Sequence, residues 1–550
     1  MELNNAFSEE RNSDMTGRFK RSAAVFALGG IMMALAAGCG AAVSEDNKGG
    51  EIALEDMNFE ADLSQIETGS LNAGSSVHDP SIIADGDKYY IVGSHMTFAY
   101  SDDLRKWTLR GNGYTSTNMI FGDLFKDETG EVFRYTGKKD SVVPTDDGGC
   151  HLWAPDIIYN KKTGLYYMYY CTSSTWNAST LGFATSETID GKYEYGKDLI
   201  YSGLTRYNLE ETDVLDYVDK DYALKHYVKL DGTYNFNEYP NALDPSVFYD
   251  KDGKMWMVYG SWSGGIYLLE IDESTGDVIH PEADPENGVD AYYGKKLLGG
   301  GHKSIEGPYI LYDPDSDYYY LFVSYGGLVS DGGYQIRVFR SKEVNGDYVD
   351  MNGKKPELYD NDHSSFGLKI SGNHTLPSLT TAYKATGHNS AFIDSDGKKY
   401  VIYHTRYENK GEYFEPRARQ YFLNEEGWPV MLPYITNGET ISASGYTADE
   451  IAGRYYLEEL GLDISGTVPT PSIIYLGKDG KVYSKASDGS VSEGSYSVSE
   501  GKYYMHITIN SEEYSGVFCK QPDEAGKEVI VFSACGQNKT IYGVKDTVNE

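Results

Sequence analysis

Three acidic residues at matching places in repeated segments could together carry out acid–base chemistry. Asp79 lies in HDPS, Asp244 in LDPS and Glu306 in EGPY. Paired carboxyl groups across a sugar-sized gap can hydrolyse a glycosidic bond, because one protonates the leaving oxygen while the other handles a water molecule or the anomeric carbon. A third acid near the proton donor raises the donor's pKa by repulsion, which keeps that donor protonated near neutral pH. An Asp before Pro is also a common turn starter, so the shared position of the three acids is what favours the functional interpretation.

Five repeated segments must position these acids. Each reads as a strand, a tight turn and a second strand, and they span residues 78–94, 153–171, 241–262, 306–324 and 387–405. Alignment on their apolar runs gives one equivalent position, occupied by Asp79, Ala154, Asp244, Gly307 and His388, with Trp153 and Glu306 one residue earlier. Each repeat predicts a four-stranded antiparallel sheet, the size of a propeller blade with loop insertions. The sequence therefore predicts a five-bladed β-propeller whose channel mouth gathers these side chains; a β-sandwich with coincidental similarity is the alternative.

The whole sequence predicts an all-β protein of two domains. Its 550 residues exceed one core, and 50 Tyr and 61 Gly are typical of Tyr-rich strands joined by tight turns. We expect the propeller over residues 75–440, with insertions near residues 111–149 and 201–239, and a small C-terminal β-barrel or sandwich over residues 444–550. The formal net charge of −35 argues against nucleic acid and polyanionic partners, whereas a neutral substrate remains compatible.

The N-terminal segment has the pattern of an export signal. Basic residues precede an apolar run from Ala23 to Ala37 that ends in small residues before Cys39. This pattern resembles a bacterial lipoprotein signal, which predicts a signal peptide over residues 1–38, lipidation of Cys39 and a flexible tether over residues 39–74. The protein would then lie at the extracellular face of the bacterial cell membrane, held by its lipid. An uncleaved membrane anchor is the alternative.

The number of remaining cysteines does not predict a disulfide framework. Cys150, Cys171, Cys519 and Cys535 are too few for a disulfide scaffold, and none has the spacing of a zinc site. Cys519 and Cys535 could form a bridge or could be two small buried residues.

The motifs around the acids resemble those of glycoside hydrolase family 43. In order, they are His78-Asp79-Pro80-Ser81, Trp153-Ala154-Pro155-Asp156, Leu243-Asp244-Pro245-Ser246 and Glu306-Gly307-Pro308-Tyr309. Four further segments, at residues 241–244, 260–262, 387–390 and 427–434, look most like the endo-acting α-1,5-L-arabinanases of that family. The resemblance implies an inverting hydrolase of arabinan and arabino-oligosaccharides that needs no organic cofactor, and we expect a monomer.

The resemblance also implies roles for individual residues. Asp79 would be the general base, Glu306 the general acid and Asp244 the acid that tunes Glu306, with base and acid roughly 6.5 to 9.5 Å apart. Substrate would be bound by Trp153, Asn241, Ser261 and Trp262. His388 would be a ligand, partly through waters, of a calcium ion in the channel. Two plainer interpretations remain: Trp153 as a core residue, and His388 as a channel histidine bonded to a backbone carbonyl.

Three other functions compete with the endo-acting one. An exo-acting α-L-arabinofuranosidase or a β-xylosidase would share the fold, and the choice depends on whether the two insertions leave an open groove or a closed pocket. A non-catalytic carbohydrate-binding surface lipoprotein is also compatible with the fold. Retention of all three acids argues against that pure binder, which would have no need of them.

Overall fold

The computed structural model describes residues 54–548, apart from residues 114–117, 122–123, 125–130, 137–150, 175–177 and 487. Cys39, the predicted signal peptide and most of the first insertion lie outside these described residues. No helix in the described part of the chain is long and apolar enough to cross a membrane.

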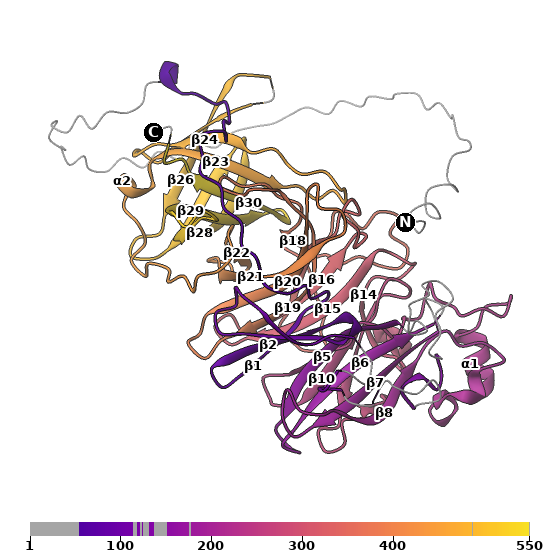
Figure 1. Ribbon diagram of the computed structural model, residues 1–550. Coiled ribbons are helices and arrows are strands. Elements are labelled where there is room, and N and C mark those ends of the chain that lie inside the picture. The colour runs from indigo at the N-terminus through magenta and orange to yellow at the C-terminus, as the bar shows by residue number, and fades with distance from the viewer. Residues whose placement is uncertain are drawn as a thin grey trace, which may run out of the picture. The chain divides into compact units, whose positions relative to one another are not determined.

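Five antiparallel sheets follow one another along the first part of the chain (Figure 1). The first two consist of β1 (Ser81–Asp85), β2 (Lys88–Gly93), β3 (Thr97–Ser101) and β4 (Thr108–Gly111), then β5 (His151–Asn160), β6 (Leu165–Ser173), β7 (Ser179–Ser186) and β8 (Glu194–Tyr201). The third consists of β9 (Ser246–Tyr249), β10 (Met255–Tyr259), β11 (Ile266–Ile271), β12 (Val278–Ile279), β13 (Val289–Asp290) and β14 (Gly294–Leu298). The last two consist of β15 (Ile305–Asp313), β16 (Tyr318–Tyr325), β17 (Gln335–Ser341) and β18 (Leu368–Ser371), then β19 (Tyr383–Ile393), β20 (Lys399–Tyr407), β21 (Phe414–Leu423) and β22 (Pro429–Met431).

The five sheets close into a ring, which confirms the predicted five-bladed propeller. The first strands of successive blades touch in the order β1, β5, β9, β15 and β19, and β19 touches β1 again. Ser390 Oγ donates to the Pro80 carbonyl across this closure at 2.8 Å, and apolar residues of blades one and five, among them Ile82 and Ile402, share one core cluster. The third blade differs from the four-stranded prediction, because the short strands β12 and β13 extend it to six.

The remaining short elements are helical. They are the 3₁₀ turns η1 (Leu54–Asp56), η2 (Ser94–Met96), η3 (Glu131–Phe133), η4 (Leu209–Glu211), η5 (Val214–Asp216) and η6 (Pro285–Asn287), with helices α1 (Lys220–His226) and α2 (Ala448–Ile451). The second predicted insertion contains η4, η5 and α1.

The C-terminal part is a closed eight-stranded barrel, so the barrel is the correct one of the two predicted alternatives. Its strands, in order, are β23 (Gly453–Leu460), β24 (Ser472–Leu476), β25 (Lys481–Lys485), β26 (Val491–Val498), β27 (Tyr504–Ile509), β28 (Glu512–Pro522), β29 (Glu528–Gly536) and β30 (Lys539–Lys545). Pairing of β23 with β30 closes it. Cys519 and Cys535 are free and buried, which excludes the bridge between them.

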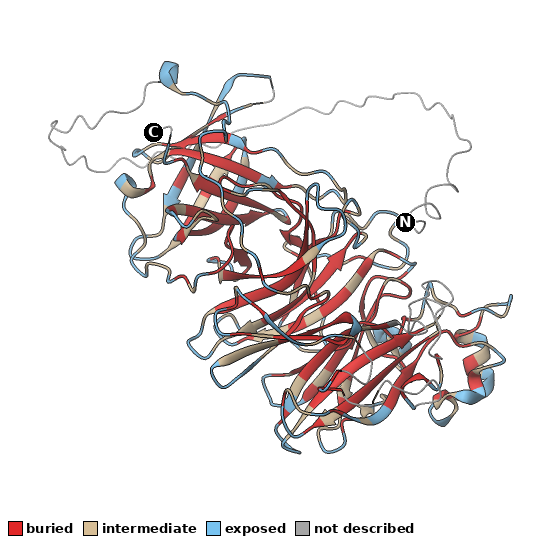
Figure 2. Ribbon diagram, viewed as in Figure 1, coloured by how far each residue is buried: buried red, intermediate tan, exposed pale blue. Residues whose placement is uncertain are grey.

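The barrel shares a hydrophobic core with the last two blades. Phe322 and Val401 of the propeller belong to the same buried cluster as Val517 and Val531 of the barrel. Burying such side chains stabilises the folded chain by about 1.5 to 3 kcal/mol each. Figure 2 shows buried residues along the strands of both the propeller and the barrel.

Part of the segment expected to be a flexible tether is instead docked. Met57, Phe59, Leu63 and Ile66 pack against the barrel cluster of Tyr456, Ile473 and Tyr475. Arg454 Nη2 donates to the Glu60 carbonyl at 2.6 Å. The prediction was based on the polar composition of this segment and did not consider that its few apolar residues could pack on the surface of the barrel.

Candidate active site

The repeat-equivalent position has one unusual backbone conformation in all five blades. The φ angles are +53° at Asp79, +35° at Ala154, +55° at Asp244, +57° at Gly307 and +49° at His388. Side chains other than glycine rarely occupy this left-handed region. In the second, fourth and fifth blades the strand register also shifts here, and such bulges re-aim side chains. The repeated conformation confirms the alignment and directs the predicted residues to one mouth of the channel.

Asp79 is surrounded by hydrogen-bond partners. Its Oδ1 lies 2.8 Å from His78 Nδ1 and 3.1 Å from His388 Nδ1, whereas His404 Nδ1 accepts from the backbone N–H of Asp79 at 3.3 Å and lies 3.6 Å from Oδ1. Ser94 Oγ donates to its other oxygen, Oδ2. Burial alone would raise the pKa of Asp79, yet His388 and His78, the two nearest imidazoles, hold that pKa well below its usual range. Asp79 is therefore ionised at neutral pH.

Arg406 lies behind two of these histidines. Its Nη2 is 3.4 Å from His78 Nε2, and its Nη1 is 3.2 Å from His404 Nε2. Because a guanidinium only donates, His78 Nε2 accepts and the ring proton lies on Nδ1, facing Asp79. Burial and the neighbouring His78 lower the pKa of His404 well below its usual range, so His404 stays neutral.

Asp244 has the opposite electrostatic environment. Its Oδ2 accepts from the backbone N–H of Gly307 at 3.1 Å. Burial, with repulsion from Asp79, raises the pKa of Asp244 to about 8. Asp244 therefore keeps a proton at pH values where Asp79 is charged.

Glu306 is oriented by three donors. Its Oε1 accepts from Tyr334 OH at 2.7 Å, and its Oε2 accepts from Trp262 Nε1 at 2.8 Å and from Ser261 Oγ at 3.2 Å. Burial and the neighbouring Asp244 raise the pKa of Glu306 to about 7. At neutral pH this carboxyl group can hold a proton and release it, as a general acid must.

A second set of residues supports this site, and the sequence interpretation missed most of it. These residues lie within three positions of the end of the second strand of each repeat: Ser94, Cys171, Ser261, Ser324 and His404. Ser94 and His404 contact Asp79, while Ser324 Oγ accepts from the backbone N–H of His388 at 2.7 Å. The signal was present, since antiparallel pairing places the end of the second strand opposite the start of the first. Tyr334 lies outside the repeats and had no such signal.

The other predicted residues also lie close to the acids. Trp153 is half-buried and packs against the core shared by blades two and three. Asn241 is buried, and its Oδ1 accepts from Ser202 Oγ at 3.1 Å. Ser261 and Trp262 reach Glu306 directly.

Oxygen donors without partners lie next to His388. A small hollow of about 20 Å³ in the channel is lined by His388, Asn389, Ser246 and Asp79, among others. Neither amide atom of the buried Asn389 has a hydrogen-bond partner, nor has Ser246 Oγ. Calcium prefers six to eight oxygen ligands, so the Asn389 amide oxygen and Ser246 Oγ suit it chemically, although the hollow has room for about one water molecule and a hydrated ion would require the lining side chains to move. The cluster of His78, Asp79 and His404 offers two nitrogens and one carboxylate, which suits transition metals better.

Comparison with known families gives two matches. Residues 74–228 and 221–429 match the model of the glycosyl hydrolases family 43, and residues 433–543 match that of a C-terminal lipocalin-like domain.

Individual relatives match over most of their length. The chain is 38% identical to an extracellular endo-α-(1→5)-L-arabinanase of Thermotoga petrophila, over 85% of this chain and 93% of the relative. It is 37% identical to extracellular endo-α-(1→5)-L-arabinanase 2 of Bacillus subtilis, over 86% of this chain and 93% of that relative. A crystal structure of the endo-1,5-α-L-arabinanase from Thermotoga petrophila RKU-1 has a TM-score of 0.73 at 37% identity and covers 87% of this chain and 100% of that one.

Proposed function

Because the chain belongs to glycosyl hydrolases family 43, we propose that it is an extracellular enzyme that hydrolyses internal α-1,5-L-arabinofuranosidic linkages of arabinan with inversion. The observation that carries this proposal is a set of three neighbouring carboxyl groups, two buried and one half-buried, whose pKa values are driven apart. In active sites, different local environments give neighbouring acids different pKa values, and this difference decides which one acts as the acid and which as the base.

In the proposed mechanism Asp79 acts as the general base. It is ionised because the imidazoles of His78, His388 and His404 face it, so it can take a proton from a water molecule as that water attacks the anomeric carbon. Ser94 and the histidines hold the carboxylate in one orientation. This fixes the direction from which water approaches.

Glu306 acts as the general acid in this proposal. Its raised pKa keeps a proton available for the leaving oxygen, and Tyr334, Ser261 and Trp262 hold the carboxyl group toward the bond. Asp244 contributes because the negative charge that it gains as pH rises toward its own pKa of about 8 opposes loss of the Glu306 proton. At lower pH it is protonated, which lets it lie near Asp79 at lower electrostatic cost. Proton transfer by a positioned group accelerates such reactions by about 10² to 10⁴-fold.

Trp153, Asn241, Ser261 and Trp262 are the proposed substrate-binding residues. Trp153 and Trp262 are only half-buried, and an aromatic ring offers an apolar face to a furanose ring. Ser261 and Trp262 also contact Glu306, which would bring sugar binding and the orientation of the acid into one place.

Product analysis tests the function. Linear arabinan, branched arabinan, xylan and an aryl arabinoside would be incubated with the wild type and with Asp79→Asn. We expect a ladder of arabino-oligosaccharides with an early loss of viscosity, absent in the variant. Arabinose as the single product, or activity only on xylan or the aryl glycoside, would favour the exo-acting alternative; no activity on any substrate would favour a binding protein.

Calcium is a further proposal. His388, with Asn389 and Ser246 nearby, would hold an ion whose charge stabilises ionised Asp79. Chelation should then lower the temperature of thermal unfolding, and added calcium should restore it. An unfolding temperature that does not respond to chelator or calcium would contradict the site.

The anchor and the oligomeric state complete the proposal. Lipidated Cys39 would hold the enzyme at the membrane surface, and Cys39→Ser should move the protein from the membrane fraction to the medium. We propose a monomer, and light scattering of the soluble variant would check its mass.

A further inference from the structure

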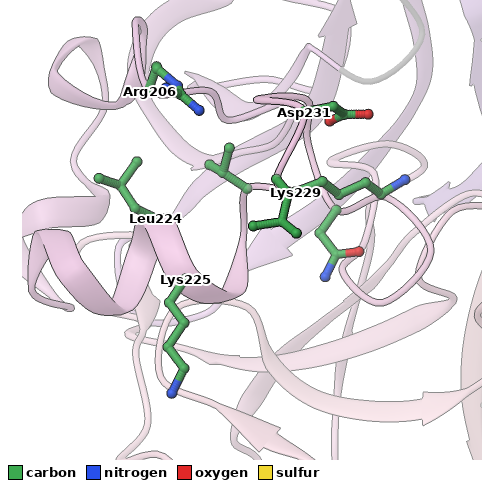
Figure 3. Close-up of a pocket in the computed structure, with 8 residues that line it drawn as sticks. Arg206, Leu224, Lys225, Lys229 and Asp231 are labelled. Atoms are coloured by element: carbon green, nitrogen blue, oxygen red, sulfur yellow. The ribbon is translucent and has the colours of Figure 1, made fainter.

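A hollow in the described residues lies away from the acids, in the second insertion. It is a basin of about 790 Å³ lined by Arg206, Leu224, Lys225, Val228, Lys229, Leu230, Asp231 and Asn235. Figure 3 shows Leu224 and Lys225 on helix α1 and Arg206, Lys229 and Asp231 on the neighbouring loops. Aliphatic walls with a few hydrogen-bonding groups are typical of a ligand site.

A row of rings connects this basin with the catalytic acid. Trp262, whose Nε1 donates to Glu306, lies 5.3 Å from His302 between ring centroids. His302 in turn lies 5.4 Å from the ring of Phe236. Lys229, at the edge of the basin, places its Nζ 3.7 Å from the Phe236 ring centre. His302 is exposed and the other two rings are half-buried, so the row faces solvent along its length.

The insertion is fixed against the third blade at this place. The backbone N–H of Gly301 donates to the Asn237 carbonyl at 2.8 Å, and that of Gly264 donates to the Tyr239 carbonyl at 2.9 Å. A Cβ atom on Gly264 would lie 2.3 Å from the Tyr239 backbone, so only glycine permits this close approach. The rings are thus held in place before substrate arrives, which lowers the entropic cost of binding.

We propose that Trp262, His302 and Phe236 form an aromatic track that binds an arabinan chain on its leaving-group side, from Glu306 to the basin of the second insertion. The proposal rests on the proposed function, because the track starts at the group that would protonate the leaving oxygen. Sugar rings pack their apolar faces on aromatic side chains, and Arg206, Lys229 and Asn235 can bond to their hydroxyl groups. An open track of this kind suits an enzyme that cuts within a chain.

Partial loss of hydration where Phe236 and Trp262 pack beside the His302 ring, together with the Lys229 ammonium, lowers the pKa of His302. The His302 ring is therefore neutral at neutral pH and can stack on a neutral sugar without carrying a charge.

The test compares long and short substrates in one enzyme. For Phe236→Leu and His302→Asn, kcat/KM would be measured on arabinohexaose and on arabinotriose, and the ratio of the two values taken. Asn suits position 302 because it tolerates the left-handed φ of +58° there. We expect the ratio to fall about tenfold in each variant, since a stacking contact made only by the longer chain is lost. Phe236→Tyr retains an aromatic ring, so its ratio should stay close to the wild-type value.

Tyr159→Ala is the matched control. Tyr159 is an exposed aromatic residue on the same propeller, about 20 Å along strand β5 from Trp153, and the ratio should stay at the wild-type value. In a Glu306→Gln background, titration with arabinohexaose followed by tryptophan fluorescence should show weaker binding for Phe236→Leu. Unchanged ratios and unchanged binding in both track variants would overturn the track. Inactivity of the wild type on every arabinan substrate would instead overturn the proposed function.

Discussion

Asp79 in blade one and Asp244 in blade three share a repeat position, a left-handed backbone and nearly equal burial, yet their acidities diverge. Their φ angles are +53° and +55°, and their exposed fractions are 7% and 8%. The pKa of Asp79 lies well below its usual range, whereas that of Asp244 is raised to about 8.

The neighbours from adjacent blades account for the difference. Asp79 faces three imidazoles, of which His388 and His404 come from blade five across the ring closure. Asp244 accepts from the backbone N–H of Gly307 and from the side chain of Ser261, and it faces the negative charge of Asp79. A closed ring of repeats can thus give identical backbones different chemical roles by varying the residues on the next blade.

The largest expected effect separates the two aspartates by activity. Asp79→Asn removes the proposed base and should lower kcat on linear arabinan by about 10² to 10⁴-fold. Asp244→Asn replaces a mainly protonated group of the same shape, so we expect a loss of about 10- to 100-fold. Initial rates at pH 6 would measure both. Circular dichroism of each variant would check folding, and equal losses would remove the distinction.

A second variant would make Asp79 resemble Asp244. His78→Asn removes the nearest imidazole, 2.8 Å from the carboxylate, and should raise the pKa of Asp79. Activity is lost as pH falls through the pKa of the base, so the acid limb of the kcat/KM profile should move up by roughly one pH unit. His506→Asn, on an exposed histidine of the barrel, serves as control. An acid limb that stays in place would show that His78 does not hold the base ionised.

A smaller effect is expected on the free energy of unfolding, where Asp79 and Asp244 contribute with opposite signs. The folded state keeps the Asp244 proton between about pH 4 and pH 8, where the unfolded chain releases it, so this residue costs stability as pH rises. Asp79, with its lowered pKa, contributes stability that is present above the unfolded pKa near 3.8 and is lost only as pH falls through the folded pKa.

Thermal unfolding of the two variants measures this contrast. At pH 7.5 Asp244→Asn should raise the unfolding temperature on the order of a few degrees, and Asp79→Asn should lower it by a similar amount. The gain for Asp244→Asn should shrink toward pH 4. Shifts of the same sign at pH 7.5 would contradict the assigned protonation states.

Much of the fold was predictable because the repeats are regular. The five segments, the position shared by the three acids and the change to a second β domain could all be read from the sequence. The two extra strands of blade three lie between repeats and carry no repeat signal. The docked segment around Met57 and Phe59 was not predicted, because local composition does not reveal a barrel face far along the chain.

The site was predictable in its acids and less so in their partners. Asp79 and Asp244 were found because they recur at one register position, and Glu306 because it lies one residue before that position in its repeat. His404 and Tyr334 reach them from other strands, and such contacts depend on how blades pack side by side. The protonation states follow from those contacts, so the sequence alone could suggest the roles without fixing the environments that set them apart.

The pH dependence of kcat/KM on linear arabinan, compared between the wild type and Asp244→Asn, tests the central claim most directly. Glu306 must be protonated to act, so wild-type activity should fall as pH rises through about 7. Asp244 loses its own proton over the upper part of the same pH range, and the charge that it gains opposes loss of the Glu306 proton. In Asp244→Asn this repulsion is absent, so the alkaline limb should move to lower pH while the acid limb stays in place. An alkaline limb that is unchanged in Asp244→Asn would contradict the assignment of Glu306 as an acid tuned by its neighbour.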